Sequence, residues 1–266
     1  LTTLGAGGIS AATPGEPAEK DIMAPGATDA YDIVVAGGGT AGAIAAIQAG
    51  RLRLRTLLVE KNGMPGGTTT VAAVNFPGLF HAWGRQLIAG IGWELVQRAV
   101  ELSGTSLPDF SSIPERHWQH QVRVNRALYS ALLCEEFQRS GTKVLFHAMP
   151  ATVKEDEDGF RLTLCTKTGL ETIRARTMID ATGDATLTAM AGYPLIEHES
   201  RQPGTLILTL TGYDFEALDK NALRNAFRKA LDTGELQERD NTFVRNNILS
   251  FLNAKGDNCT HIAGID

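Results

Sequence analysis

The chain has 266 residues, of which 43% are hydrophobic and 21% are charged, and its formal net charge is −5. This composition is typical of a globular protein of about one or two domains. The acidic balance, and the lack of a basic stripe interleaved with aromatic residues, argue against a nucleic-acid-binding protein. No apolar run in the sequence approaches the ~18 residues that a membrane-spanning helix needs.

The three cysteines, Cys134, Cys165 and Cys259, show neither C-x-x-C spacing nor clustering with histidine. An odd number of cysteines without a spacing pattern predicts free thiols, with no disulfide framework and no metal site. Cys134 lies in the mostly apolar stretch ALLCEEF, so we expect it to be buried in a helix.

The first residues of the chain, LTTLGAGGISAA, are uncharged and rich in small side chains. They resemble the latter part of a secretory signal peptide, of the twin-arginine kind in particular, with Ser10 and Ala12 at a plausible cleavage site. The alternative is a flexible glycine- and alanine-rich tail on a cytoplasmic protein. Residues 13–29 contain three prolines and indicate a linker. We therefore expect residues 1–30 to be a signal remnant and linker, and the protein to be exported to the periplasm or the cell exterior.

The next stretch, YDIVVAGGGTAGAIAAIQAG, covers residues 31–50. The continuous apolar run Ile33–Ala36 indicates a strand that is buried on both faces. Residues 41–49 contain strong helix formers and no proline, so they indicate an α-helix.

Between this strand and this helix, Gly37, Gly39 and Gly42 fit the pattern G-x-G-x-x-G. The first glycine permits a tight turn, the second lets a pyrophosphate approach the backbone, and the third lets the helix pack closely on the strand. The helix N-terminus then presents free N–H groups and a positive dipole to that phosphate. The order of strand, glycines and helix is the context that this pattern requires.

A second predicted strand, Thr56–Val59, runs into Glu60. An acid about 20 residues after the glycines, at the carboxyl end of a strand, is placed to accept hydrogen bonds from a ribose. The alternative is a solvated charge at a strand end, which does not explain that spacing. The sequence therefore predicts an adenine dinucleotide site.

The remaining elements are predicted from periodicity and turn residues. After a loop with Gly63, Gly66 and Gly67, the pattern gives helices at Arg85–Leu102 and Val124–Arg139, strands at Lys143–His147, Phe160–Cys165, Thr172–Ile179 and Leu206–Leu210, and a charged helix at Phe215–Leu231. Gly141 is expected to stop the second of these helices. This order predicts an α/β fold of three layers, in which a parallel sheet has helices on one face and a small β-meander on the other.

The segments DIVVAGGGTAG, LLVEKNGMPGGT, VNRALYSALLCEEF, VLFHA and IDATGDATLTAMAG occur in this order. Together they resemble FAD-dependent oxidoreductases of the glutathione-reductase-like superfamily, which are distant relatives of the fumarate reductase and succinate dehydrogenase flavoproteins. The resemblance implies a Rossmann-like FAD/NAD(P)-binding domain at residues 31–195, with a helical insertion at 70–122. Residues 196–266 would then be the start of a truncated substrate or cap domain.

The resemblance also implies FAD as the cofactor and assigns residues to it. The first glycine loop would face the pyrophosphate, Glu60 the adenosine ribose, and the later loops the remainder of the pyrophosphate and the ribityl chain. The residues assigned in this way are Gly37, Gly38, Gly39, Thr40, Ala41, Gly42, Glu60, Lys61, Gly66, Gly67, Thr68, Ala181, Thr182, Gly183 and Asp184. For the last four, the alternative is an ordinary strand-to-helix turn with Asp184 as the N-cap.

Two residues depart from the family's pattern. Arg53 stands where the family usually has a glycine after the first helix, and a non-glycine residue in left-handed backbone there costs ~1 kcal/mol. Pro150 removes one backbone donor from a strand that commonly contacts the adenine. The family's closing flavin segment would lie beyond Asp266, so we expect a fragment that binds FAD weakly on its own.

The resemblance implies hydride transfer between a small organic substrate and the flavin, with a protein acid or base to handle the proton. The sequence does not identify that residue; the candidates are His81, Arg85 and His261, and an ordinary loop histidine is the alternative for His81. A sugar-derived or carboxylate compound is the kind of substrate expected. Two other functions stay open: an NAD-binding dehydrogenase without flavin, and a non-catalytic module in which the dinucleotide is structural.

Overall fold

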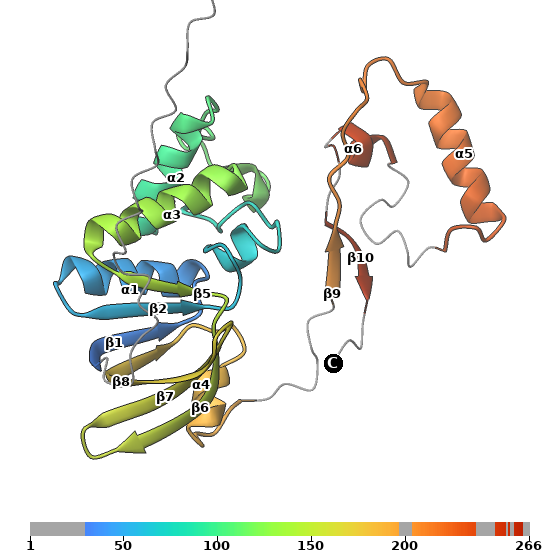
Figure 1. The fold of residues 1–266 in the computed structure, drawn as a ribbon. Coiled ribbons are helices and arrows are strands. Elements are labelled where there is room, and N and C mark those ends of the chain that lie inside the picture. The colour runs from blue at the N-terminus through green and yellow to red at the C-terminus, as the bar shows by residue number, and fades with distance from the viewer. Residues whose placement is uncertain (1–29, 197–203, 238–247, 254, 256–257, 263–266) are drawn as a thin grey trace, which may run out of the picture.

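The computed structural model describes residues 30–196, 204–237, 248–253, 255 and 258–262. Residues 1–29, which include nearly all of the expected signal remnant and linker, lie outside the described residues. The larger body is built on a six-stranded sheet in the order β5-β2-β1-β8-β7-β6, as Figure 1 shows. Its strands are β1 (Ala30–Ala36), β2 (Thr56–Glu60), β5 (Lys143–Phe146), β6 (Met149–Asp156), β7 (Gly159–Thr166) and β8 (Gly169–Asp180).

Strand β1 lies at the centre of the parallel half of this sheet. It pairs in parallel with β2, where Val35 lies opposite Leu58, and with β8, where Val35 lies opposite Ile179. A parallel strand in this position is covered on both faces, and for that reason it needs an unbroken apolar sequence. Val34, Val35 and Leu58 are accordingly 0% exposed.

Three helices cover one face of the sheet: α1 (Thr40–Arg51), α2 (Ile91–Leu102) and α3 (Arg126–Ser140). In Figure 1, α1 lies next to the sheet, and α2 and α3 lie over it. Side chains from all three helices join the sheet in one buried cluster. This cluster includes Ile47 of α1, Leu95 of α2, Leu133 of α3, and Val35 and Leu58 of the sheet.

The opposite face is covered by the meander of β6, β7 and β8. Strand β8 belongs to both layers, because it pairs with β7 from Gly169 to Ala175 and with β1 from Arg174 to Asp180. Successive side chains of a strand point to opposite faces, so Val34 packs against the meander residues Leu162 and Ile173 while its neighbour in β1 packs against the helices. The predicted three-layer α/β fold is confirmed.

The helix predicted from Arg85 starts six residues later, at Ile91. Gly90 precedes it with a φ of 79° and a ψ of −153°, a conformation that a helix cannot include. The first residues of the predicted helix instead form the strand β4 (Arg85–Gln86), which pairs with β3 (His81–Ala82) in a small hairpin. The apolar pattern was therefore correct for the helix and wrong for its start.

Strand β6 was not predicted from the apolar pattern, although the family resemblance implied a strand at Pro150. It is an edge strand of the sheet, and its sequence MPATVKED has no clear apolar alternation because only Val153 is buried. Pro150 lies opposite Leu164 at an irregularity in the pairing with β7. An edge position at a bulge tolerates a residue without an N–H donor.

The described residues after 203 form a second, smaller body. It contains β9 (Gly204–Ile207), α5 (Lys220–Asp232), α6 (Ile248–Asn253) and β10 (Asn258–Ile262), with β9 and β10 paired in antiparallel. Both β9 and α5 are shorter than predicted, and α5 begins where the Asp219 side chain accepts hydrogen bonds from the N–H groups of Asn221 and Ala222.

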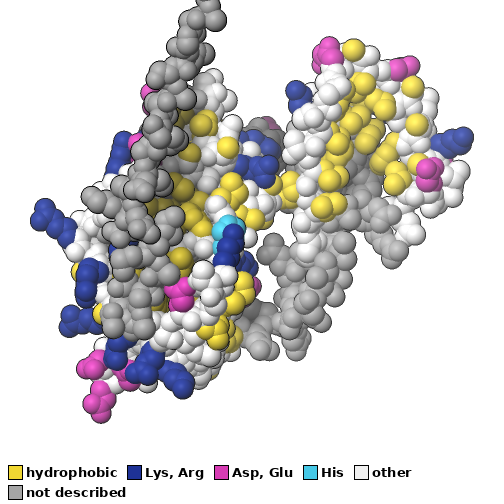
Figure 2. Space-filling view, viewed as in Figure 1, with side chains coloured by type: hydrophobic (Ala, Val, Ile, Leu, Met, Phe, Trp, Pro, Cys, Tyr) yellow, Lys and Arg dark blue, Asp and Glu magenta, His cyan; other side chains and the backbone are white. Residues whose placement is uncertain are grey.

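This second body has little apolar core of its own. None of the residues of α5 is buried, and Leu206 and Leu208 are 52% and 40% exposed. Figure 2 shows hydrophobic side chains gathered on the visible surface of this body. In the part of the chain that the structure describes, no helix is both long enough and apolar enough to cross a membrane.

A buried carboxylate joins the three helices of the larger body. Glu136 of α3 forms ion pairs with Arg51 of α1 at 3.1 Å, with Arg98 of α2 at 2.9 Å and with Arg139 at 3.1 Å, and its side chain is 9% exposed. Burial raises the pKa of this carboxyl, but the bonds and charges of Arg51 and Arg139 outweigh it and leave the pKa below its usual value. The groove between α2 and α3 is lined mostly by side chains of this ion-pair network, so we assign it to stability. Its lining residues are Glu94, Gln97, Arg98, Glu101, Glu136 and Arg139.

The expectation that Cys134 is buried is wrong. Its side chain is exposed on α3, because the buried stripe of that helix runs through Leu132, Leu133, Glu136 and Phe137. Cys134 and Cys165 are both free thiols.

Arg53, one of the two residues that depart from the family's pattern, follows the end of α1. Arg53 has a φ of 63°, in the left-handed region. Its N–H donates to the carbonyl oxygen of Gly50 at 2.8 Å, and the N–H of Leu54 donates to that of Ala49 at 3.2 Å. These two bonds form the Schellman motif, in which the left-handed position is usually glycine. Helix α3 ends in the same motif with glycine, because Gly141 has a φ of 75° and donates to Gln138.

We predict that Arg53→Gly stabilises the protein. The Arg53 side chain is exposed, so glycine removes the left-handed penalty and loses little packing. The free energy of unfolding should rise by about 0.5–1 kcal/mol, measured by urea denaturation. The matched control is Gly141→Ala, which should lower it by a similar amount. An Arg53→Gly protein less stable than the parent would contradict this account of the helix end.

Candidate functional site

The first glycine loop follows β1, and two of its glycines are required by the protein's own packing. Gly37 has a φ of 97°, and a Cβ there would lie 2.2 Å from the carbonyl oxygen of Ala181. A Cβ on Gly42 would lie 1.9 Å from the carbonyl oxygen of Gly37. Both distances are shorter than any real Cβ contact, so a side chain at either position would push the loop, α1 and β8 apart.

Gly39 is different, because no atom of the described residues occupies the place of its missing side chain. Its φ is −65°, which any residue can adopt. A Cβ there would meet only the Cα of Gly67, at 4.0 Å. The open space therefore lies between the two glycine loops, at the start of α1.

The N-terminus of α1 has no cap from a side chain. Gly39 is its N-cap residue, and the first turn holds no acidic residue. The N–H groups of residues 40–42 have no carbonyl to bond within the helix. Free N–H groups and a positive helix end beside open space fit an anionic group such as a phosphate.

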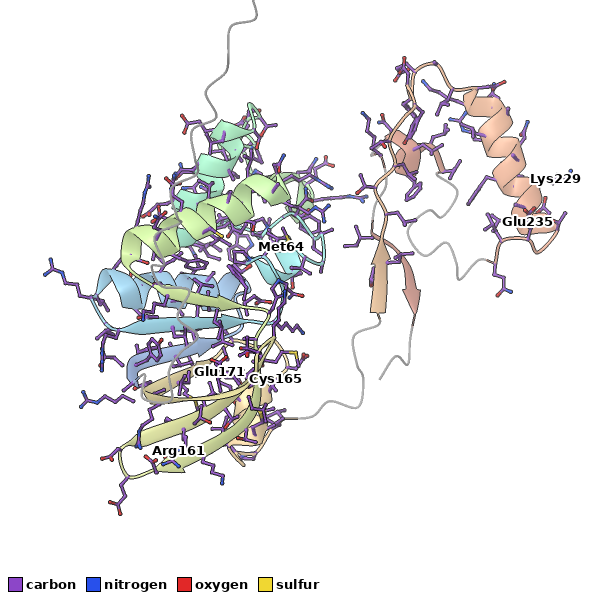
Figure 3. All side chains as sticks on the ribbon, in the orientation of Figure 1. Met64, Arg161, Cys165, Glu171, Lys229 and Glu235 are labelled. Carbon is purple, nitrogen blue, oxygen red and sulfur yellow. The ribbon has the colours of Figure 1, made fainter. Side chains whose placement is uncertain are left out.

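The second glycine loop follows β2 and lies directly against the first. The N–H of Gly66 donates to the carbonyl oxygen of Gly38 at 2.7 Å, and Gly66 forms a β-bridge with Gly39. A Cβ on Gly67 would lie 2.8 Å from the Cα of Gly39. Figure 3 labels Met64, which leads into this loop. The absence of side chains lets the two backbones form adjacent walls of the same space.

Glu60 lies at the end of β2, beneath the first loop, and is 4% exposed. Its Oε2 accepts a hydrogen bond from the N–H of Gly38 at 2.6 Å. Its Oε1 accepts from the N–H and the side-chain amide of Asn62, at 2.7 and 2.6 Å. A carboxylate oxygen has two lone pairs, so Oε2 retains one for a further donor such as a ribose hydroxyl. Lys61 beside it is exposed.

The third segment of the site is the turn after β8. The N–H of Ala181 donates to the carbonyl oxygen of Ala36 at 2.8 Å, which joins the turn to the end of β1. Gly183 and Asp184 are exposed. The reading of Asp184 as an N-cap is wrong: Ala185 holds that position before α4 (Thr186–Met190), and the hydroxyl of Thr182 accepts from the N–H of Thr186.

Three loops thus meet at the carboxyl ends of β1, β2 and β8. Loops from neighbouring parallel strands share one edge of a sheet, which is where α/β folds bind ligands. The predicted residues that meet at this edge are those of 37–42, 60–61, 66–68 and 181–184. Their role towards a cofactor stays a prediction.

The histidine considered for catalysis is part of an aromatic cluster. The ring of His81 stacks on Phe110 with centroids 3.8 Å apart and meets Trp93 edge-on at 5.1 Å. Its Nδ1 is buried and has no hydrogen-bond partner. Burial, and then the charge of His120, lower the pKa of His81 below its usual value. The imidazole is therefore neutral near pH 7.

The other two candidates lie on different strands from His81. Arg85 is exposed on β4, in the hairpin with β3. His261 lies on β10, opposite Thr205 of β9, in the second body. Within the residues that the structure describes, no group of three or more histidine, cysteine, aspartate or glutamate side chains is placed to hold a metal ion.

Two polar residues of the site were missed by the sequence reasoning. Asn62 donates to the carboxylate of Glu60, and Asp180 accepts hydrogen bonds from Thr182 in the third turn and from Thr188 in α4. The signal for Asp180 was its place at the end of a buried strand, directly before Ala-Thr-Gly.

Comparison with known proteins gives a match over most of the chain. The model of a family described as FAD dependent oxidoreductase matches residues 32–257. A dihydrolipoyl dehydrogenase from Trypanosoma brucei brucei is 49% identical over 53 residues, which are 20% of this chain and 11% of that protein. The chain thus matches only a small part of this curated relative.

Solved structures also resemble the chain in part. An anhydrotetracycline hydroxylase, OxyS from Streptomyces rimosus, is 18% identical with a TM-score of 0.46, over 66% of this chain and 36% of that one. A flavoprotein/dehydrogenase from Cytophaga hutchinsonii is 20% identical with a TM-score of 0.43, over 62% of this chain and 42% of that one. The chain spans less than half the length of either structure.

We predict that Gly39→Val abolishes dinucleotide binding and leaves the protein folded. Its backbone conformation suits valine, and the new side chain would fill only the space between the loops. Bound cofactor after purification and the circular dichroism spectrum are the measurements. As a control, Gly42→Ala should harm folding itself, because its Cβ would overlap the carbonyl oxygen of Gly37. A Gly39→Val protein with its full complement of cofactor would show that this space is not the phosphate site.

A second prediction concerns Glu60→Gln. The loss of a charge-assisted hydrogen bond to ribose should weaken cofactor binding by roughly 1.5–3 kcal/mol. The new amide NH₂ must also face an N–H donor of Gly38 or Asn62, so the cofactor-free protein should lose some stability. Affinity is measured by titration at one salt concentration, with Asn62→Ala as the control that disturbs the same carboxylate less. Equal affinities for parent and Glu60→Gln proteins would remove Glu60 from the site.

Proposed function

We propose that this chain, which belongs to the FAD dependent oxidoreductase family, forms the cofactor-binding part of an enzyme that transfers hydride between a small organic substrate and FAD. The family's cofactor is FAD. The activity, the substrate and the residues that hold the cofactor are proposals.

The observation that carries the proposal is the space at Gly39. It is bounded by the uncapped N-terminus of α1 and by the backbone of Gly66 and Gly67, and among the described residues no atom fills the place of a side chain at Gly39. An anionic pyrophosphate would receive hydrogen bonds there from the N–H groups of residues 40–42. Beneath it, the free lone pair of Glu60 Oε2 suits a ribose hydroxyl. The two features together fit an adenine dinucleotide.

The remaining assigned segments would hold the rest of the cofactor. Residues 66–68 would line the pyrophosphate and the ribityl chain, and the turn 181–184 would close the site from the side of β8. When bound, FAD supplies the acceptor or donor of a hydride. The chain's own residues bind it, orient it and exclude water from its phosphates.

For the accompanying proton, the described residues offer His81. Its lowered pKa keeps the imidazole neutral, which is the form that a general base needs. Arg85, exposed on the same hairpin, suits a substrate with a carboxylate or another anionic group. We propose these two roles together, and His261 only as a further candidate from the second body.

We also propose a location and a division of the chain. The uncharged, small-residue stretch 1–12 supports export by the twin-arginine route, which carries folded proteins and suits a protein that takes up its cofactor first. The larger body corresponds to a cofactor-binding domain at residues 31–195, and residues 196–266 to part of a substrate domain.

The experiment is to release and identify the cofactor. The protein is purified from several expression conditions, its visible spectrum is recorded, and heat-released nucleotide is separated by chromatography. We expect a flavin spectrum and FAD in the supernatant. Reduction of the bound flavin by a substrate would then separate an enzyme from a non-catalytic module. Recovery of NAD, or of no nucleotide under all conditions, would refute the proposal.

A further inference from the structure

Asp180 is the last residue of β8, and its carboxylate bonds both to the turn that follows and to the helix after that turn. Its Oδ1 accepts hydrogen bonds from the N–H and the hydroxyl of Thr182, at 3.0 and 2.7 Å. Its Oδ2 accepts from the N–H and the hydroxyl of Thr188, both at 2.9 Å. A carboxylate has about four lone-pair sites, so all of them are used within the protein and none is left for a ligand.

These bonds join the turn to a helix that has little support of its own. Helix α4 has five residues, and Thr188 lies within it. The turn that leads into it contains two left-handed residues, Gly183 with a φ of 92° and Ala185 with a φ of 55°. A left-handed alanine is unfavourable and persists only where its surroundings fix it. The four bonds to Asp180, and the bond from the N–H of Thr186 to the hydroxyl of Thr182, supply that constraint.

The position of this turn also fixes the first glycine loop. The carbonyl oxygen of Ala181 lies where a Cβ of Gly37 would be, 2.2 Å from it, and the Cβ of Ala181 lies 2.9 Å from that of a side chain at Gly42. Because these contacts leave no free space, a displacement of the turn would move the glycine loop as well. Asp180 is therefore linked to the open space at Gly39 through the backbone of the turn 181–184 and then that of the first glycine loop.

The ionisation of Asp180 agrees with this arrangement. Burial raises the pKa of its carboxyl, but the hydrogen bonds from Thr188 and Thr182 outweigh burial and leave the pKa below its usual value. The carboxylate is therefore charged at neutral pH, when all four donors are satisfied.

We propose that Asp180 is a positioning residue of the cofactor site: it sets the turn 181–184 before the cofactor binds, and through Ala181 it sets the first glycine loop. This inference rests on the proposed function, because it assumes that the loops hold FAD. Asp180 itself does not touch the cofactor.

The test compares FAD affinity with stability in two matched aspartate variants. In Asp180→Asn the amide must turn its NH₂ towards the backbone N–H of either Thr182 or Thr188, which disturbs the turn. Asp156→Asn is the control, since Asp156 also ends a strand and bonds Arg174 at 3.0 Å, but in the meander. FAD is titrated into flavin-free protein by fluorescence, and the unfolding temperature is measured without FAD.

We expect Asp180→Asn to weaken FAD binding roughly tenfold or more, and Asp156→Asn to leave the affinity unchanged even where its unfolding temperature falls. The visible circular dichroism of flavin at saturating FAD should change in Asp180→Asn and not in Asp156→Asn, because the loops that orient the cofactor have moved only in the former. Thr188→Val keeps the shape of the side chain and removes one bond, so it should fold and show a smaller loss in the same direction.

Parent affinity in both Asp180→Asn and Thr188→Val would overturn the inference. The inference would also be overturned if Asp180→Asn and Asp156→Asn both lost FAD affinity in the same proportion to their fall in unfolding temperature. The effect would then be general destabilisation. Failure of the proposed function looks different: the parent protein would bind no FAD, or Gly39→Val would bind it as the parent does.

Discussion

The backbone contact between the first glycine loop and the turn after β8 is the constraint on which the rest of the site depends. Ala181 donates to the carbonyl oxygen of Ala36, and its own carbonyl oxygen fills the place of a side chain at Gly37. This contact holds the neighbouring ends of β1 and β8 together and fixes where α1 begins. The free N–H groups of that helix, and the open space in front of them, follow from it.

The second constraint is the buried charge of Glu60. A carboxylate that is 4% exposed would be costly without partners, and the N–H groups of Gly38 and Asn62 supply them. The same side chain therefore shapes the first loop and leaves one lone pair towards the proposed ribose. Because the loop is held before a ligand arrives, binding does not have to order it, and that saves free energy on association.

The sequence was sufficient where the signal is local. The apolar run of β1, the glycines and Glu60 can each be recognised by residue type and spacing. The glycine after α3 ends that helix as expected. The three-layer arrangement followed from the order of elements, because a meander before the last parallel strand has to cover the face that the helices leave open.

The rest depended on tertiary contacts. Strand β6 lacks an apolar pattern because it lies at the edge of the sheet, and Cys134 is exposed because the phase of α3 is set by its packing on α1 and α2. An aspartate at a strand end is ordinarily a solvated charge, so nothing in the sequence tied Asp180 to Thr188, eight positions away.

The three glycines of the first loop show where a motif stops being informative. In sequence, Gly37, Gly39 and Gly42 are equivalent members of one pattern. In the structure, a Cβ on the first or third would lie 2.2 or 1.9 Å from a carbonyl oxygen, whereas a Cβ on the second would meet no atom of the described residues closer than 4.0 Å. Two of the glycines are therefore required by the fold, whereas the absence of a side chain at Gly39 is needed only for the proposed cofactor. Loss of function after a change at Gly37 or Gly42 would say little about a cofactor, because the loop itself would be displaced. A change at Gly39 leaves the protein's own contacts intact, so its effect on binding can be assigned to the ligand.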